Sequence, residues 1–183
     1  GAALDIAASG SLTSLIDVMH VSGTVNVDGS LVTPGDYLNV GGLLSGSGTI
    51  TTPFLTNVAG AIAPGGLGAE GQLSIDGSLI LSSGSILLMD VSATGNDLLN
   101  VSGDVSLGGV IELAGAAAYG DQYSVMSYGG TSSGAFSDVT GLGAGVLQAL
   151  ITDAGGVIQL SIDAGSFLDV LPEAPSGVQR YYA

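Results

Sequence analysis

Few side chains in this sequence have the chemistry of a catalyst, and the single histidine is the first to consider. His20 lies in the apolar run 18–21, with Asp17 and Ser22 close by. A histidine can act as the general base for a serine when a carboxylate orients it. Acidic and hydroxyl residues are common throughout this chain, so such neighbours carry little information. We therefore expect His20 to be a structural residue whose ring nitrogens are hydrogen-bonded inside the fold.

Two glycine-containing segments match known functional patterns. Residues 130–134 read Gly-Thr-Ser-Ser-Gly, the pattern of a nucleophile elbow, which requires a strand-to-helix turn and a histidine further along the chain. No histidine follows this segment. Residues 66–71 read Gly-Leu-Gly-Ala-Glu-Gly, but no helix pattern follows them to bind a pyrophosphate. With 32 glycines in 183 residues, both matches are expected by chance, and they predict turns.

The carboxylates are better candidates for ligand binding. Asp28, Asp76 and Asp104 occupy turn-like positions beside apolar runs, and Asp97 follows Asn96. Stacked repeats would align some of these oxygens for Ca²⁺, which takes about six to eight oxygen ligands. The sequence contains no EF-hand loop and no calcium-binding nonapeptide repeat. These four aspartates are therefore weak calcium candidates; we expect them to cap turns, and we expect no metal or cofactor.

Composition argues against several classes of function. A sugar-cleaving pair of carboxylates is conceivable, but aromatic residues make up 5% of the chain and Trp is absent, so we expect no enzymatic activity. The formal net charge is −15, with one basic residue against 16 acidic ones. Nucleic-acid binding is excluded because it depends on Lys and Arg that neutralise phosphates. Anionic membrane surfaces are disfavoured for the same reason.

The chain also has the composition of a secreted protein. It lacks Cys, which rules out disulfides and thiolate metal sites. No apolar stretch is long enough to span a bilayer. The N-terminus lacks the basic and apolar regions of a signal peptide, so we expect any such peptide to have been removed already. We expect the protein to be extracellular or on a bacterial cell surface.

Short apolar runs separated by glycine must position all of these side chains. Alternating runs such as 72–76 and short continuous runs such as 85–89 are typical of half-buried and fully buried strands, respectively. Residues 25–31 and 73–79 align with each other, and 160–167 is a third, longer copy. Repeats that cannot bury a face alone are the signature of solenoids. Helix patterns are nearly absent.

We therefore predict an all-β fold, a right-handed parallel β-helix of about seven to eight coils over residues 1–167. Residues 168–183 contain two prolines and are expected to form an extended C-terminal tail or edge segment. A β-sandwich is the alternative, because strand counts do not separate parallel coils from antiparallel hairpins. Asp-Gly corners suit hairpins as well.

Residues 44–139 resemble the C-terminal part of the passenger domains of bacterial autotransporters, the proteins of type V secretion. No single segment is specific, but their order is. The matching segments are Gly-Ser-Gly-Thr-Ile (46–50), Ala-Pro-Gly (63–65), Gly-Gln-Leu-Ser-Ile-Asp-Gly (71–77), Gly-Ser-Ile-Leu (84–87), Asn-Asp-Leu-Leu-Asn-Val-Ser-Gly (96–103), Leu-Gly-Gly (107–109), Gly-Asp-Gln-Tyr-Ser-Val (120–125) and Ser-Gly-Ala-Phe (133–136). The resemblance implies an extracellular β-helix and brings no catalytic residues with it.

Two functions follow as expectations. The first is a structural protein that associates with itself head-to-tail into a surface filament or layer, because open strand edges related by translation form non-closing contacts. The cationic and aromatic cluster Arg180, Tyr181 and Tyr182 would serve this self-association on an acidic molecule. The second is an adhesin or stalk segment that binds host or neighbouring cells, for which long loops would be the sign. The best loop candidates are 119–136 and 141–145.

Overall fold

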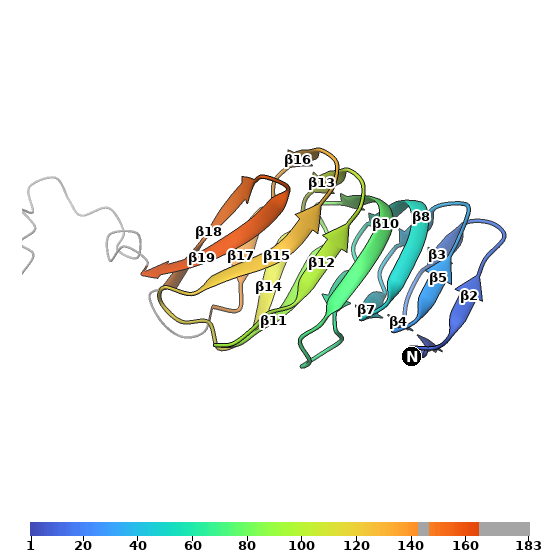
Figure 1. Ribbon diagram of the computed structural model, residues 1–183, viewed down its shortest axis with the longest axis horizontal. Coiled ribbons are helices and arrows are strands. Elements are labelled where there is room, and N and C mark those ends of the chain that lie inside the picture. The colour runs from blue at the N-terminus through green and yellow to red at the C-terminus, as the bar shows by residue number, and fades with distance from the viewer. Residues whose placement is uncertain (143–146, 165–183) are drawn as a thin grey trace, which may run out of the picture.

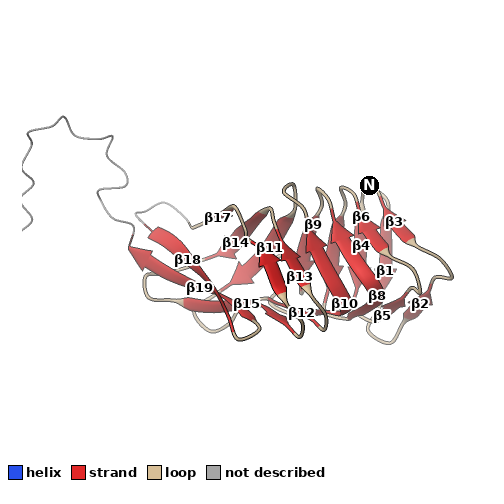
Figure 2. Cartoon of the chain, turned by 90° about the horizontal axis from the view of Figure 1, so that it is seen from above, coloured by secondary structure: helices blue, strands red, loops and turns tan. Residues whose placement is uncertain are grey.

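Short runs that end at glycine form strands throughout the computed structural model, which describes residues 1–142 and 147–164. The described residues contain no helix (Figure 2). Accordingly, no helix in this part of the chain is long and apolar enough to cross a membrane. The strands follow one another along the long axis of the molecule, from the N-terminal coil to the C-terminal hairpin (Figure 1). The all-β prediction is confirmed.

The strands form three ladders, and most of their pairing is parallel. The first ladder consists, in hydrogen-bonding order, of β1 (Ala3–Ile6), β4 (Thr24–Val27), β7 (Leu43–Gly46), β9 (Ala61–Pro64), β11 (Ile86–Val91), β14 (Val110–Gly115) and β17 (Asp138–Thr140). The same ladder position returns after roughly 20–25 residues, the period expected for stacked short-strand repeats.

The second ladder forms another side of the stack. Its members are β2 (Ser11–Thr13), β5 (Ser30–Val32), β8 (Thr49–Asn57), β10 (Gln72–Leu81), β12 (Leu98–Val101), β15 (Gln122–Tyr128), β19 (Val157–Ala164) and β18 (Leu147–Ala154). The third ladder adds β3 (Val18–His20), β6 (Tyr37–Asn39), the second halves of β8 and β10, β13 (Val105–Leu107) and β16 (Ser132–Gly134). The strands β8 and β10 therefore bend and serve two ladders each.

The interior consists of columns of like residues, one from each coil. In the first ladder Leu44, Ile62, Leu87 and Ile111 are paired in sequence and buried. The second and third ladders contribute equivalent columns, Leu31, Ile50, Ile75 and Val101, and Tyr37, Leu55, Leu79 and Val105. Alternation along each strand sends these residues inward and their neighbours outward. Burial of this apolar surface is what holds the stack together.

This arrangement is consistent with a β-helix or solenoid. Sandwiches are built mainly from antiparallel sheets. In the described residues antiparallel pairing is confined to β15 with β19, β18 with β19, and the single bridge between Val91 and Asn96. The parallel ladders therefore favour the coil over the sandwich alternative.

The parallel stack reaches seven strands in the first ladder, the lower end of the seven to eight coils expected from the sequence. The third ladder goes no further than β16 within the described part of the chain. Beyond β17 the chain reverses into the hairpin β18–β19, which pairs with β15. The third sequence copy, at 160–167, was therefore misassigned as a coil. Its described residues belong to this antiparallel hairpin, because a Gly-Gly turn at 155–156 folds the strand back on its neighbour.

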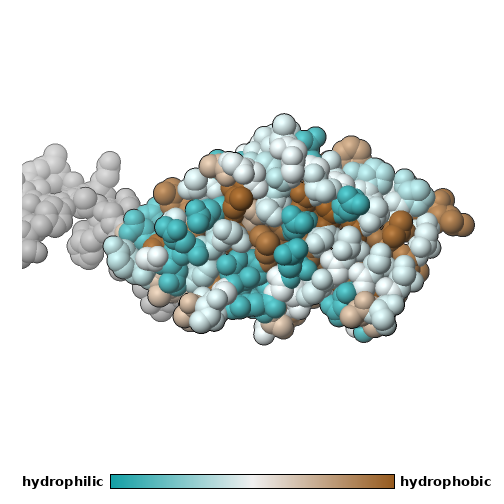
Figure 3. Space-filling model, viewed as in Figure 1, coloured by the Kyte–Doolittle hydropathy of each residue, from teal (hydrophilic) through white to brown (hydrophobic). Residues whose placement is uncertain are grey.

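The N-terminal coil differs from the inner ones in its surface. Within the described chain its strands β1, β2 and β3 each pair on one side. Exposed aliphatic side chains gather on this coil and colour the right-hand end of the molecule in Figure 3: Leu4, Leu12, Leu15, Ile16, Met19 and Val21. The inner coils keep most of their large apolar residues inside.

Candidate functional site

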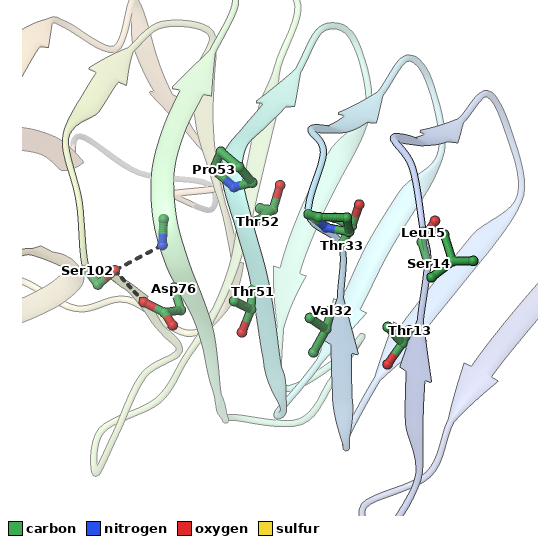
Figure 4. A pocket seen from close by; sticks show the side chains of 12 residues that line it. Thr13, Ser14, Leu15, Val32, Thr33, Thr51, Thr52, Pro53, Asp76 and Ser102 are labelled. Carbon is green, nitrogen blue, oxygen red and sulfur yellow. Dashed lines mark hydrogen bonds between the residues drawn. The ribbon is translucent and has the colours of Figure 1, made fainter.

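An open groove of about 650 Å³ lies beside the bend between the second and third ladders (Figure 4). It runs along successive coils rather than into the core. Its lining residues come from the ends of β2 and β5, from the bends of β8 and β10, and from the turns that follow β2, β5 and β12. A groove in this direction can receive an extended ligand that follows the axis of the stack.

Outward-facing side chains form a column on one wall of the groove. Thr13 pairs with Val32, Val32 with Thr51, and Thr51 with Asp76, so these residues lie one above another. The exposed Asp76 carboxylate accepts a 3.0 Å hydrogen bond from the Ser102 hydroxyl. The column therefore offers hydroxyl groups and one carboxylate oxygen at the spacing of neighbouring strands, which is about 4.8 Å.

Apolar and satisfied polar groups make the rest of the lining. Leu15, Pro34 and Pro53 contribute the apolar surface. The hydroxyls of Thr33 and Thr52 are already engaged with backbone oxygens: Thr33 donates to Ile16 at 2.7 Å, and Thr52 to Gly35 at 2.9 Å. These bonds fix the bend and leave its hydroxyls unavailable to a ligand. The groove thus has the apolar surface with a few convergent polar groups that is common in binding sites.

A second feature lies at another corner of the stack, between the first and second ladders. Three successive turns have longer connections there, 65–71, 92–97 and 116–121. Leu67 is 64% exposed and Tyr119 is 69% exposed. The sequence-based loop candidate 119–136 was wrong in most of its length, because β15 and β16 occupy it. Candidate 141–145 lies mostly outside the described residues.

His20 stands in an internal polar ladder. It pairs with Asn39, and Asn39 pairs with Asn57. The side chain at each of these positions donates to the carbonyl three residues later: His20 to Gly23 at 3.3 Å, Asn39 to Gly42 at 3.1 Å and Asn57 to Gly60 at 2.7 Å. The Tyr37 hydroxyl donates to the other ring nitrogen of His20 at 3.4 Å. Burial lowers the pKa of His20. These contacts agree with the structural role expected for this histidine.

Neither glycine pattern has the surroundings that its chemistry needs. Ser132 lies in β16 and donates a hydrogen bond to Asp153, and no helix follows it in the described chain. His20 belongs to the first coil, far away in the stack. The segment 66–71 is the exposed loop after β9, with no helix behind it. The segment 66–71 is a turn, as expected, whereas residues 132–134 of the other segment form the strand β16 rather than a turn.

The four candidate calcium ligands are not brought together. Asp28 accepts from the Ser47 amide, and Asp104 accepts from the amide and hydroxyl of Thr131. Asp76 lies in the groove and Asp97 is buried beneath the loop 65–71. In the described residues no three acidic or histidine side chains form a metal-binding group. Asp28 and Asp104 bind amides of the next coil, 19 and 27 residues along the chain, so these bonds are not the local Asx turns that the sequence predicted.

The remaining expectation for a site concerns the C-terminal tail, and Arg180, Tyr181 and Tyr182 lie outside the described residues. Conversely, the groove was not found from the sequence. Its available signal was the period of hydroxyl residues at 13–14, 33 and 51–52 next to prolines at 34 and 53. That period becomes visible only after the coils are aligned by their strand register.

Comparison with known proteins shows a similarity to part of an autotransporter adhesin. Over 103 residues the chain is 40% identical to the adhesin BmaC autotransporter of Brucella suis biovar 1 (strain 1330). The match covers 50% of this chain and 3% of that protein, so the chain corresponds to a small part of its length. No protein-family model matches the sequence.

Proposed function

We propose that this chain is a non-enzymatic, passenger-type segment of an adhesin, a right-handed parallel β-helix that works at the bacterial surface or outside the cell. The observation that carries the proposal is the 40% identity to an autotransporter adhesin over half of the chain. The parallel ladders support it, because a stack of coils is an extended scaffold that can hold contact surfaces. Its partners would be host or neighbouring cells.

The groove is the contact surface that we assign to this function. Its lining includes Leu15, Pro34 and Pro53 beside hydroxyl groups and the Asp76 carboxylate. An extended polymer on a cell surface could contact several coils at once, and contacts that repeat along a rigid scaffold add affinity with little loss of conformational entropy. The described residues contain no Lys or Arg, so we expect the ligand to be neutral or cationic.

A purely structural role as a head-to-tail filament is the weaker candidate. It would require the C-terminal end of one copy to continue the ladders of the next, yet the antiparallel hairpin β18–β19 occupies that end of the second ladder in the described chain. The division into a β-domain, 1–167, whose last described strands are the hairpin β18–β19, and a tail, 168–183, remains part of the proposal, as does the absence of a cofactor.

Attachment of coated particles tests the proposed function. Fluorescent beads carrying the purified chain are incubated with cultured epithelial cells and with bacterial cells, and bound beads are counted against albumin-coated beads. We expect binding well above that of the albumin beads to at least one cell type. Binding equal to the albumin control on both cell types contradicts the adhesin proposal.

A matched pair of variants tests the groove. Thr51→Trp fills the groove from its wall, whereas Thr49→Trp places the same side chain two residues away on the same face of β8, outside the groove lining. We expect Thr51→Trp to reduce attachment at least fivefold and Thr49→Trp to leave it within twofold of the unmodified chain. Equal attachment by both variants would leave adhesion standing and reject the groove.

A further inference from the structure

Two carboxylates are buried beneath the exposed loop 65–71. Asp97 is 0% exposed and Asp90 is 8% exposed. The described residues contain no Lys or Arg that could neutralise them. Buried charges without a cationic partner are costly, so their hydrogen bonds must account for their presence. Neither residue belongs to the groove.

Backbone amides supply those hydrogen bonds and connect two segments of the chain. Asp97 accepts from the Gly71 amide and from the Asp90 amide, both at 2.8 Å. Asp90 in turn accepts from the Gly68 and Ala69 amides at 2.8 and 3.1 Å. The two carboxylates therefore fasten three amides of the loop 65–71 to the end of β11 and the start of β12.

The loop needs such a fastening because of its composition. Gly65, Gly66 and Gly68 have positive φ angles of 76°, 98° and 77°. Glycine loses more backbone entropy on ordering than any other residue. The loop also projects Leu67, which is largely exposed and gives it little apolar contact. Backbone bonds hold both ends of the loop, from Gly65 to Gly46 and from Leu98 to Gly71, whereas Gly68 and Ala69 in its middle bind the Asp90 carboxylate. The ionisation of these carboxylates therefore bears directly on the loop.

The surroundings of Asp97 oppose its ionised form. Burial is the main cause that raises its pKa to about 6, and repulsion by Asp90 and Glu70 adds to it, whereas its two amide partners act in the other direction. The next coil contributes Asp121 and Tyr123, and burial together with the Asp121 contact raises the pKa of Tyr123 to about 12. No cationic group in the described residues balances these charges.

We propose that Asp97 is a pH-sensitive latch, which holds the loop 65–71 more firmly in mildly acidic solution than at neutral pH. When the loop opens, Asp97 gains access to water, and its pKa returns towards the ordinary value of about 3.9. The closed state then has the higher affinity for the proton, and linkage requires that acid favours it. A protonated carboxyl keeps acceptor capacity for the two amides. This inference does not depend on the adhesin proposal.

The size of the effect follows from the two pKa values. Between pH 7 and pH 5, a group with a pKa near 6 in the closed state and near 4 in the open state shifts the equilibrium towards closure about tenfold. Below pH 4 both states are protonated, so the gain levels off. The loop should change over the range in which Asp97 titrates in the closed state.

Native-state amide hydrogen exchange measures the latch on the intact chain. Protection factors, corrected for the intrinsic pH dependence of exchange, are compared for Gly68, Ala69 and Gly71 at pH 7, 6 and 5. We expect them to rise about tenfold on acidification. The Thr131 amide is the internal reference, because it binds the exposed Asp104, whose pKa is lowered by its Thr131 hydrogen bonds; its protection should not rise.

Variants separate the latch from general effects of pH. Asp97→Asn cannot titrate and should abolish the pH response of the loop, whereas Asp104→Asn should retain it. The same experiment in the His20→Asn background removes the histidine that titrates nearest to this range. A flat or opposite response in the unmodified chain, or an unchanged response in Asp97→Asn, overturns the proposal.

A direct titration covers the case in which Asp97→Asn does not fold. The carboxyl carbon of Asp97 is followed by NMR in the unmodified chain. We expect a midpoint near pH 6. A midpoint below about 4.5, close to the ordinary aspartate value, would overturn the latch.

Discussion

The parallel coils and the C-terminal hairpin use similar sequences to build different pairings. Residues 73–76 read Leu-Ser-Ile-Asp and belong to β10, which lies parallel to β8 and β12. Residues 160–163 read the same and belong to β19, which lies antiparallel to β15 and β18. In both strands the Leu and Ile face the core. The alternation of side chains thus determines which face is buried, and the direction of the neighbouring strand is decided elsewhere.

Glycines have different surroundings in the coils and in the hairpin. At a corner of the coils, a Cβ added to Gly77 would lie 1.7 Å from the Thr52 carbonyl oxygen of the coil below. At the hairpin turn, Gly155 has nothing within 4 Å of such an atom. Glycine in the coils therefore permits close stacking of backbones, whereas in the hairpin it permits a tight reversal with positive φ. Four predictions follow from this difference.

The largest effect is expected from alanine at these two glycines. Gly77→Ala combines an unfavourable φ of 151° with a clash against the coil below, and should lower the free energy of unfolding by about 4 kcal/mol. Gly155→Ala has only an unfavourable φ of 62° and should cost about 1 kcal/mol. Urea denaturation followed by circular dichroism measures both. Equal losses would mean that stacking distance is not what distinguishes the two regions.

The second-largest effect is expected at the buried isoleucines of the two Leu-Ser-Ile-Asp segments, Ile75 and Ile162. Ile75 pairs with Ile50 on one side and Val101 on the other, so Ile75→Ala should leave a cavity that costs about 3 kcal/mol. Ile162 pairs with the smaller Ala149 in the hairpin, and Ile162→Ala should cost about half as much because its cross-strand partner has little apolar surface to lose contact with. The same denaturation experiment applies. A larger loss for Ile162→Ala would place the more important packing in the hairpin.

The internal polar ladder of His20, Asn39 and Asn57 lies in the coils and has no counterpart in the hairpin of the described chain. Asn57→Ala removes the acceptor of the 2.8 Å bond from Asn39 and the donor to Gly60, and leaves buried polar groups unsatisfied. We expect a loss of about 2 kcal/mol. Asn100→Ala, on an outward position of β12, is the comparison: it loses only the part-buried bond from the Ser127 hydroxyl, which water can replace, and should cost no more than about 0.5–1 kcal/mol. Similar effects of both variants would argue against a special role for the ladder.

The smallest effect concerns pH and the first position of that ladder. Because burial lowers the pKa of His20, its contribution to stability is fully present above the unfolded pKa of about 6.5 and is lost as the pH falls from there through the lower pKa of the folded state. The variant His20→Asn places a side-chain amide at this position, as Asn39 and Asn57 do in the next coils, and removes the titrating imidazole. The melting temperature of the unmodified chain relative to His20→Asn should therefore be lower at pH 5 than at pH 7. If the difference in melting temperature between the two chains is the same at pH 5 and pH 7, the prediction is wrong.

The candidate site shows how much of the molecule could be read from residues. The interior columns were foreseeable, because Ile50 and Ile75 lie in recognisable alternating runs. The role of Asp28 and Asp104 was foreseeable only in part: aspartates beside glycine commonly bind amides of their own turn, whereas these two bind amides of the next coil. The groove was not, because Thr51 and Asp76 become neighbours only through the register of β8 and β10. The burial of Asp97 under a glycine loop gave no local sign in the sequence.

By itself, the sequence determined that the chain forms many short strands, that glycine separates them, and that one face of each strand is buried, because these follow from side-chain size, period and backbone freedom. Tertiary structure decided which strand lies beside which, and in which direction. Side-chain alternation is the same in parallel and antiparallel strands, so only the path of the chain, the stacking of coils up to β17 and the reversal at Gly155 and Gly156, distinguishes them. The groove and the loop latch are products of that path.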